Sequence, residues 1–210
     1  MSVGTQELLA WLEGLQRVYS ENRQRLTELD SAIGDADHGI NMDRGFTAAK
    51  AELAGNPPTD IRAALQAVAA TLIRSVGGAS GPLYGTFFLR AGAACAGRQE
   101  LGAADVLTMF GAGIDGVQQR GKAGAGDKTM LDALLPALAA MEKSSESGGT
   151  AAEMLADGAA AAETGMMATV PMQARKGRAS YLGPRSVGHQ DPGATSAWLL
   201  LKTAAGVLAP

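Results

Sequence analysis

The 210-residue sequence is poor in cysteine, in aromatic residues and in long apolar runs. Its single cysteine, Cys95, cannot form an internal disulfide, and its alanine-rich surroundings are typical of a buried structural thiol in a reducing cytoplasm. No apolar run approaches the roughly 18 residues that a membrane span needs. The 18 basic and 21 acidic residues form no basic stripe. We therefore expect a cytoplasmic protein that binds neither membrane nor nucleic acid.

What the sequence does contain is a helical pattern from end to end. Leucine, alanine and methionine recur at three- and four-residue spacing, whereas β-branched and aromatic residues never alternate over a strand length. This pattern predicts an all-α protein that forms a single domain over residues 1–210. Thr59, Asp127 and Thr150 are the expected N-caps, and Pro136 should kink the sixth helix. The expected helices cover residues 5–29, 41–53, 60–76, 83–96, 103–120, 128–143, 150–173 and 194–209.

The connections between these helices fall into two sets. Ordinary polar linkers occupy residues 54–59, 97–102 and 144–149, whereas the other four connections are rich in glycine. Alternate connections emerge at the same end of an antiparallel bundle, so the four glycine-rich connections should converge there. The N-termini of four helices would meet at the same end and would favour anions. The glycine-rich connections are residues 30–41, 77–82, 121–127 and 174–193.

Aspartates dominate the first glycine-rich connection, DSAIGDADHGIN. Asp30 lies at the C-terminal end of the first expected helix. Asp35 and Asp37 are two residues apart, so they can converge only from an irregular loop, which Gly34 and Gly39 permit. Three carboxylates without cysteine form a site of hard oxygen ligands, which suits Mg²⁺ that also binds phosphate. An EF-hand is excluded by spacing. The alternative is that Asp35 and Asp37 are solvated turn residues.

The other glycine-rich connections add groups that suit phosphates. In GGASGP, Ser80 could cap a helix or donate to a phosphate, although the segment could also be a plain turn between helices. GKAGAGDKT is not a P-loop, because Asp127 precedes Lys128 and the segment before it is helical rather than a strand. The connection 174–193 contains Arg175, Lys176, Arg178 and Arg185 and is interpreted as a lid over phosphates, with disorder as the alternative.

The two histidines and the larger aromatic residues are given structural roles. His38 and His189 are each flanked by stronger candidate ligands, so we expect them to orient neighbouring groups. Phe87, Phe88 and Trp198 are expected to lie in the core or in the lumen of the bundle. Whether side chains or a lipid-like ligand fill that lumen is left open.

The segments GDADHGINM, SVGGASGPLYGTFF, GVQQRGKAGAGDKTM and MQARKGRASYLGPRSVGHQDPGATS together resemble the nucleotide-binding L subunits of bacterial dihydroxyacetone kinases. The resemblance implies a barrel of eight antiparallel helices with the nucleotide in the loops at one end. It also implies that Asp30, Asp35 and Asp37 hold two Mg²⁺ ions, and that these aspartates and Arg178 are the catalytic residues. The positions implied to contact ADP or ATP are His38, Gly39, Ile40, Asn41, Ala79, Ser80, Gly121, Met130, Arg178, Asp191, Pro192 and Gly193.

The chemistry implied by the resemblance is phosphoryl transfer. Bound ADP would be recharged to ATP by a phosphohistidine on an M subunit, and the phosphate would pass to dihydroxyacetone on a separate K subunit. Two alternatives stay open: an ATP-exchanging subunit of a kinase for another small ketose, and a nucleotide-dependent regulator that docks on a transcription factor. Metal-dependent hydrolysis is disfavoured, because no base for a water is evident. Gly124, Ala125 and Pro184 depart from the family pattern, which puts loop stiffness and partner docking in doubt.

Overall fold

The computed structural model describes residues 2–208, and these residues are mostly helical. The predicted all-α class is confirmed except for a two-stranded sheet that is too short to show in the sequence pattern. In that sheet Val3 pairs with Leu101 and Gly4 with Glu100, antiparallel. The elements are β1 (Val3–Gly4), α1 (Thr5–Glu21), α2 (Arg23–Ile33), α3 (His38–Gly55), α4 (Ile61–Ser75), α5 (Ser80–Ala94), β2 (Glu100–Leu101), α6 (Ala103–Gly121), α7 (Leu131–Glu146), α8 (Ala151–Ala168), the 3-10 helix η1 (Arg178–Ser186) and α9 (Pro192–Val207).

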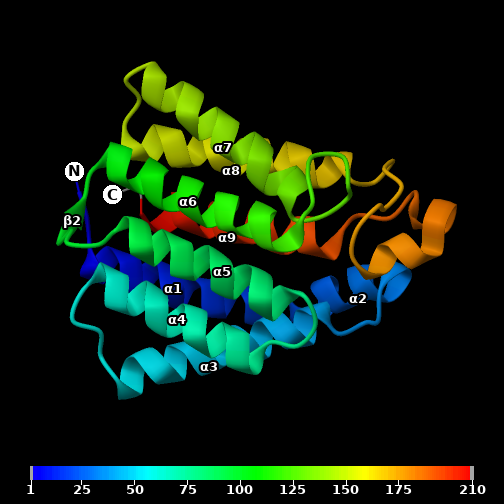
Figure 1. Cartoon of the computed structure of the whole chain (residues 1–210), viewed down its shortest axis with the longest axis horizontal. Coiled ribbons are helices and arrows are strands. Elements are labelled where there is room, and N and C mark those ends of the chain that lie inside the picture. Colours follow the sequence, from blue (N-terminus) through cyan, green and yellow to red (C-terminus); the bar gives the residue numbers. More distant parts are fainter. Residues whose placement is uncertain (1, 209–210) are drawn as a thin grey trace.

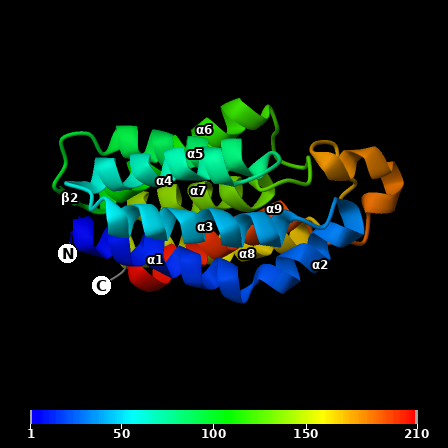
Figure 2. The same cartoon turned by 90° about the horizontal axis from the view of Figure 1, so that it is seen from below.

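The long helices follow one another around a common core. From α3 to α9 each α-helix contacts the next, and α1 contacts both α3 and α9, so the order of neighbours closes on itself. Their axes run side by side along the molecule (Figures 1 and 2). Aromatic rings pack in the interior: the centroid of Trp11 lies 5.5 Å from that of Phe110 and 5.8 Å from that of Phe88. Phe87, Phe88 and Trp198 are buried, as expected for core residues.

The expected count of eight helices is not confirmed, because residues 2–208 contain nine α-helices and one 3-10 helix. The expected helix 5–29 is broken at Asn22, whose side-chain Nδ2 donates to the carbonyl oxygen of Val18 at 2.8 Å. Asparagine competes in this way for backbone partners, which the hydrophobic pattern does not reveal. The second piece, α2, continues to Ile33, so Asp30 lies in the last turn of this helix rather than just after the expected end at residue 29.

Two of the three predicted N-caps are wrong. The cap of α4 is Asp60, whose Oδ1 accepts from the backbone N–H of Ala63 at 2.7 Å, and α7 begins after Met130 rather than Asp127. Thr150 caps α8 as predicted. Pro136 lies inside α7.

Other helix boundaries also shift. The expected helix 150–173 ends at Ala168, shortly before Pro171, because a proline disfavours helical geometry in the residue before it. Helix α3 starts three residues before the expected 41, and α9 starts at Pro192 rather than at residue 194. Residue 209, the expected end of the last helix, lies outside the described residues.

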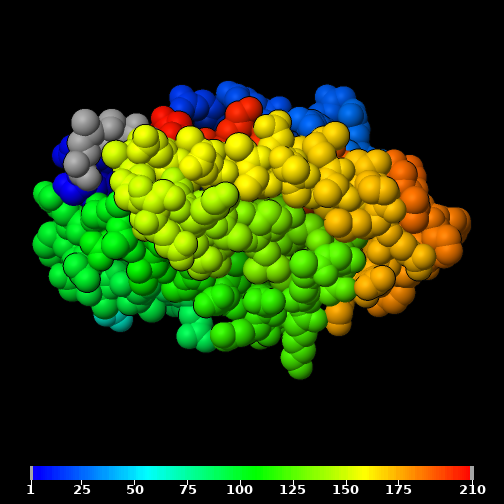
Figure 3. All heavy atoms as spheres, turned by 90° about the horizontal axis from the view of Figure 1, so that it is seen from above, coloured from blue at the N-terminus to red at the C-terminus, as the bar shows by residue number. Residues whose placement is uncertain are grey.

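The connections sort to the two ends of the molecule. The small sheet and the polar linkers lie at one end, and the glycine-rich connections lie at the other (Figure 1). The segment 174–193, called the lid below, projects at that second end, where Figure 3 shows it in orange beyond α7 and α8. Within residues 2–208, no helix is both long enough and apolar enough to cross a membrane.

Candidate functional site

The glycine-rich end carries two adjoining hollows of about 520 and 530 Å³. All four glycine-rich connections contribute to their walls, so the structure brings these segments together. The hollows share Asp30, His38, Ala79, Ser80 and the lid residues 176–178. The first hollow has a largely apolar wall and the second contains the aspartates. The apolar part is lined by Ile33, Pro82, Leu83, Val117, Ala123, Met130, Leu131 and Ala179.

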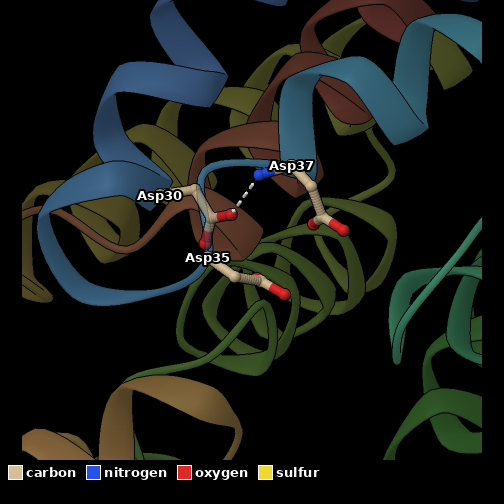
Figure 4. Close-up of side chains that lie close together, drawn as sticks. All are labelled: Asp30, Asp35 and Asp37. Atoms are coloured by element: carbon tan, nitrogen blue, oxygen red, sulfur yellow. Dashed lines mark hydrogen bonds between the residues drawn. The ribbon is translucent and has the colours of Figure 1, made fainter.

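Three aspartates gather where α2 meets the start of α3 (Figure 4). Asp30 is buried, and its Oδ2 accepts from the backbone N–H groups of Asp37 at 2.9 Å and His38 at 3.1 Å. The turn between them is tight, because a Cβ built on Gly34 would lie 2.0 Å from Asp30 Oδ1 and Ala36 has a left-handed φ of 61°. One carboxylate oxygen from each of Asp30, Asp35 and Asp37 lies within 4.8 Å of the others. This all-oxygen donor set fits a hard divalent cation such as Mg²⁺.

The lid reaches the aspartates through an arginine. Arg178 is the first residue of η1, and its Nη2 lies 2.9 Å from Asp35 Oδ2. Both side chains are partly exposed, so the pair is open to exchange for other ions. Ala174 and Ala179 pack with Ile33 of α2 in a small apolar cluster beneath the lid. In the described structure this segment therefore lies over the three aspartates.

His38 is held on both ring nitrogens. Its Nε2 lies 2.9 Å from Ser196 Oγ, and Ser80 Oγ lies 3.1 Å from its Nδ1. Ser196 Oγ donates to the carbonyl oxygen of Gly193 and accepts from the hydroxyl of Tyr84 at 2.7 Å. Burial lowers the pKa of His38, and the nearby Asp30 opposes that shift. The predicted orienting role of His38 agrees with these contacts, whereas His189 is exposed and lines neither hollow.

The start of α9 forms the back wall of the first hollow. Asp191 is its N-cap, and its Oδ2 accepts from the backbone N–H of Ala194 at 2.7 Å. Burial raises the pKa of Asp191 to about 7, although the Ala194 hydrogen bond works against that rise. Pro192 and Gly193 line the same wall.

Most of the predicted site residues line the hollows, and three do not. The lining residues are Asp30, Asp35, Asp37, His38, Ala79, Ser80, Gly121, Met130, Arg178, Asp191, Pro192 and Gly193. Gly39 packs α3 onto α2 instead, because a Cβ there would lie 2.0 Å from the carbonyl oxygen of Arg23. Ile40 is 39% exposed on the outside, and Asn41 Oδ1 accepts from Arg44 Nη2 at 2.6 Å.

Several residues around the site were not predicted. Asp132 organises the loop before α7 by accepting from the backbone N–H groups of Gly126 and Thr129. Its position in the first turn of a helix was a usable signal. Lys128 is 1% exposed and donates to two backbone carbonyl oxygens, which no feature of the sequence indicated. Tyr84 and Ser196 lie far apart in the sequence and meet only in the fold.

Comparison with known proteins gives consistent results. The DAK2 domain family model matches residues 32–206. The chain is 46% identical, over 96% of its length and 96% of the relative's, to the PEP-dependent dihydroxyacetone kinase, ADP-binding subunit DhaL, of Escherichia coli strain K12. It is 41% identical, over 91% of each chain, to the ADP-binding subunit DhaL of PEP-dependent dihydroxyacetone kinase 1 of Listeria innocua.

A solved structure shares the fold. The dihydroxyacetone kinase of C. freundii, crystallised in complex with AMP-PNP and Mg²⁺, superposes with a TM-score of 0.74 at 22% identity, over 98% of this chain and 34% of that one. At this identity the likeness shows the fold alone. The matches to the family model and to the full-length relatives carry the assignment, and the resemblance seen in the four sequence motifs is confirmed. The chain belongs to the DAK2 domain family, in which it groups with the L subunits of bacterial dihydroxyacetone kinases.

Proposed function

We propose that this chain is the ADP- and ATP-binding subunit of a dihydroxyacetone kinase and that it relays a phosphoryl group through its bound nucleotide. The observation that carries the proposal is the cluster of Asp30, Asp35 and Asp37 beside a hollow with an apolar wall. A nucleoside diphosphate matches both parts of this site, since the faces of its base are apolar and its phosphates bind cations. The full-length relatives named as ADP-binding kinase subunits support the same function.

In this proposal the nucleotide lies with its base against the apolar wall and its phosphates toward the aspartates. Asp30, Asp35 and Asp37 would hold two Mg²⁺ ions, which would neutralise charge on the transferred phosphoryl group. Ser80 and the N-termini of α3 and α5 supply hydrogen-bond donors to the phosphates. Arg178 exchanges its bond to Asp35 for the transferred phosphoryl group and stabilises its charge. His38 and Asp191 hold these donors in position, and Gly121 and Met130 border the base.

The proposed reaction needs partners, because nothing among the described residues is assigned to a sugar. A phosphohistidine on an M subunit recharges ADP to ATP, and a K subunit presents dihydroxyacetone. We place this relay in the cytoplasm. We also propose that the chain is a single domain in which antiparallel helices form a barrel, and the closed order of helix contacts supports the barrel. There are two alternatives. One is an ATP-exchanging subunit of a kinase for another small ketose, and the other is a nucleotide-dependent regulator that docks on a transcription factor.

The first test is the nucleotide and magnesium content of the purified protein after extensive dialysis. Denaturing release, chromatography and metal analysis would measure both. About one ADP with Mg²⁺ per chain supports the relay, whereas an empty protein that binds added Mg-ATP reversibly supports the ATP-exchanging alternative. A protein that binds neither would overturn the proposal and return Asp35 and Asp37 to solvated turn residues.

A further inference from the structure

Lys128 is a buried cation, and among residues 2–208 no carboxylate is bonded to it. Its side chain is 1% exposed, and its Nζ donates to the carbonyl oxygens of Met172, at 3.0 Å, and Ser186, at 2.5 Å. Burial lowers the pKa of this ammonium, while the charge of Asp191 opposes the shift. Lysine is almost never fully buried unless it is paired. The two carbonyl groups are therefore a specific receptor for this side chain.

The two receptor carbonyls belong to the two sides of the lid. Met172 precedes the lid, and Ser186 is the last residue of η1. Ser186 is itself fully buried, and its Oγ accepts from the backbone N–H of Ala174 and donates to the carbonyl oxygen of Gly183. The Lys128 ammonium thus connects the segment just before the lid with the end of η1.

The backbone at Lys128 is adapted to this bridge. Lys128 has a φ of 61°, in the left-handed region that is costly for a residue with a side chain. The preceding residue adds another tie, because the carbonyl oxygen of Asp127 accepts from the backbone N–H of Arg175 at 3.0 Å. The loop before α7 and the lid are consequently held together by side chain and backbone at one point.

From this geometry we infer that Lys128 is a positioning residue that anchors the lid and thereby keeps Arg178 over the aspartates. The anchor lies at the end of η1, and Arg178, which pairs with Asp35, lies at its start. η1 bends at Gly183, whose φ is 56°. Release of the anchor frees the part of the lid after this bend and, through it, the turn that carries Arg178. Lys128 also borders the hollow with the apolar wall, so the same movement opens the nucleotide's exit. This role in nucleotide retention rests on the proposed function.

The test compares Lys128→Met with the wild-type protein, using Lys143→Met at the exposed end of α7 as the matched control. Hydrogen exchange of residues 174–188 in the nucleotide-free protein measures the anchor directly. We expect faster exchange in the lid of Lys128→Met, with unchanged protection in α1 and α5 and no change in Lys143→Met. Unchanged hydrogen exchange in the lid of Lys128→Met would overturn the inference, whether or not the protein binds nucleotide.

A second readout is the rate at which Mg-ADP dissociates, measured by chasing a fluorescent ADP analogue with unlabelled ADP. We expect about a tenfold faster release from Lys128→Met, the cost of losing a charged hydrogen bond, and partial rescue in Lys128→Arg. Equal release rates would contradict the inference. If Lys128→Met fails to fold, Ser186→Ala removes the neighbouring hydroxyl contacts and should loosen the lid to a smaller degree. A wild-type protein that binds no nucleotide overturns the proposed function, while the exchange experiment still decides the anchor.

Discussion

The two ends of the helical bundle treat the starts of their helices differently. At the end with the small sheet, Asp60 caps α4, Asp105 accepts from the N–H of Gly102 before α6, and Thr150 caps α8. At the glycine-rich end, α3, α5 and α7 receive no capping bond from their own N-cap side chains, and only α9 does, from Asp191. Free N–H groups at a helix start attract anions. At the glycine-rich end, neighbouring side chains bond the starts of α3 and α7, because Asp30 Oδ2 accepts from the His38 N–H and Thr129 Oγ1 accepts from the Leu131 N–H. Among the described residues, the start of α5 has no such side-chain bond and leaves its donors for a ligand.

The comparison makes a general prediction about substitutions. Changes at the capped end should lower the free energy of unfolding and leave nucleotide binding unchanged. Changes among the site residues should weaken nucleotide binding without lowering the free energy of unfolding. Charged and polar groups gathered around a ligand are placed for binding rather than for packing. The four predictions below run from the largest expected effect to the smallest.

The strongest effect is expected for Asp35→Ala. Loss of one proposed metal ligand should lower Mg²⁺-dependent nucleotide retention by more than about 100-fold, since even outer-shell partners of metals are worth about 10–100-fold. Nucleotide and Mg²⁺ content after dialysis is the measurement, and Asp157→Ala on the exposed face of α8 is the control. Undiminished retention of nucleotide in Asp35→Ala would remove the metal site from the proposal.

Arg178→Ala should have a smaller effect on the same ligand. The loss of one charge-assisted contact to a phosphoryl group is worth about tenfold in affinity or transfer rate. Phosphoryl transfer to dihydroxyacetone, reconstituted with the K and M subunits, would measure it, with Arg185→Ala on the same lid as the control. Equal losses in the two variants would show that the lid needs only its general positive charge.

Asp191 gives a prediction about pH. Its pKa is raised from 3.8 to about 7 in the folded protein, so the folded state holds a proton that the unfolded state has lost between these values. The contribution of Asp191 to the free energy of unfolding is therefore fully present below pH 3.8 and is lost as the pH rises through 7. Asp191→Asn should flatten the fall in free energy of unfolding between pH 5 and 8, by on the order of 1 kcal/mol. Urea unfolding at both pH values measures it, and an unchanged slope would contradict a buried, protonated Asp191.

Thr150→Ala tests the capped end. The bond from the Glu153 N–H to the Thr150 hydroxyl would be lost, while the backbone N–H of residue 150 could still donate to Glu153. The loss should cost about 1 kcal/mol of stability. Thermal unfolding measures the loss, and the affinity for Mg-ADP should stay at the wild-type value. A parallel fall in affinity would mean that the two ends are coupled, and the division between them would then be wrong.

Much of this arrangement was predictable from local sequence. Glycine-rich connections at alternate positions were enough to predict that Asp30, Ser80, Gly121 and Arg178 approach one another, because helical periodicity fixes the order of the elements. The break at Asn22 was not predictable in this way, since the apolar pattern continues across it. Its consequence is that Asp30 is presented from a helix and receives the N–H groups of the next helix.

The burial of Lys128 could not be predicted from the local sequence, for a different reason. Its partners are backbone carbonyl groups 44 and 58 residues away, and carbonyl groups have no sequence signature. Gly39 shows a different case, in which the resemblance suggested a ligand contact that stays a prediction. Close approach to the carbonyl oxygen of Arg23 explains the glycine without a ligand.

The closed order of the helices has a practical consequence for engineering. Helix α1 begins and α9 ends at the end that carries the small sheet, and the two helices are neighbours (Figure 1). A reporter domain fused at either end of the described chain would therefore lie away from the hollows. Joining α9 to α1 through a short linker and opening the chain between α3 and α4 would give a circular permutant with both new ends on that same side. Such a permutant should keep its aspartates, its lid and its ligand.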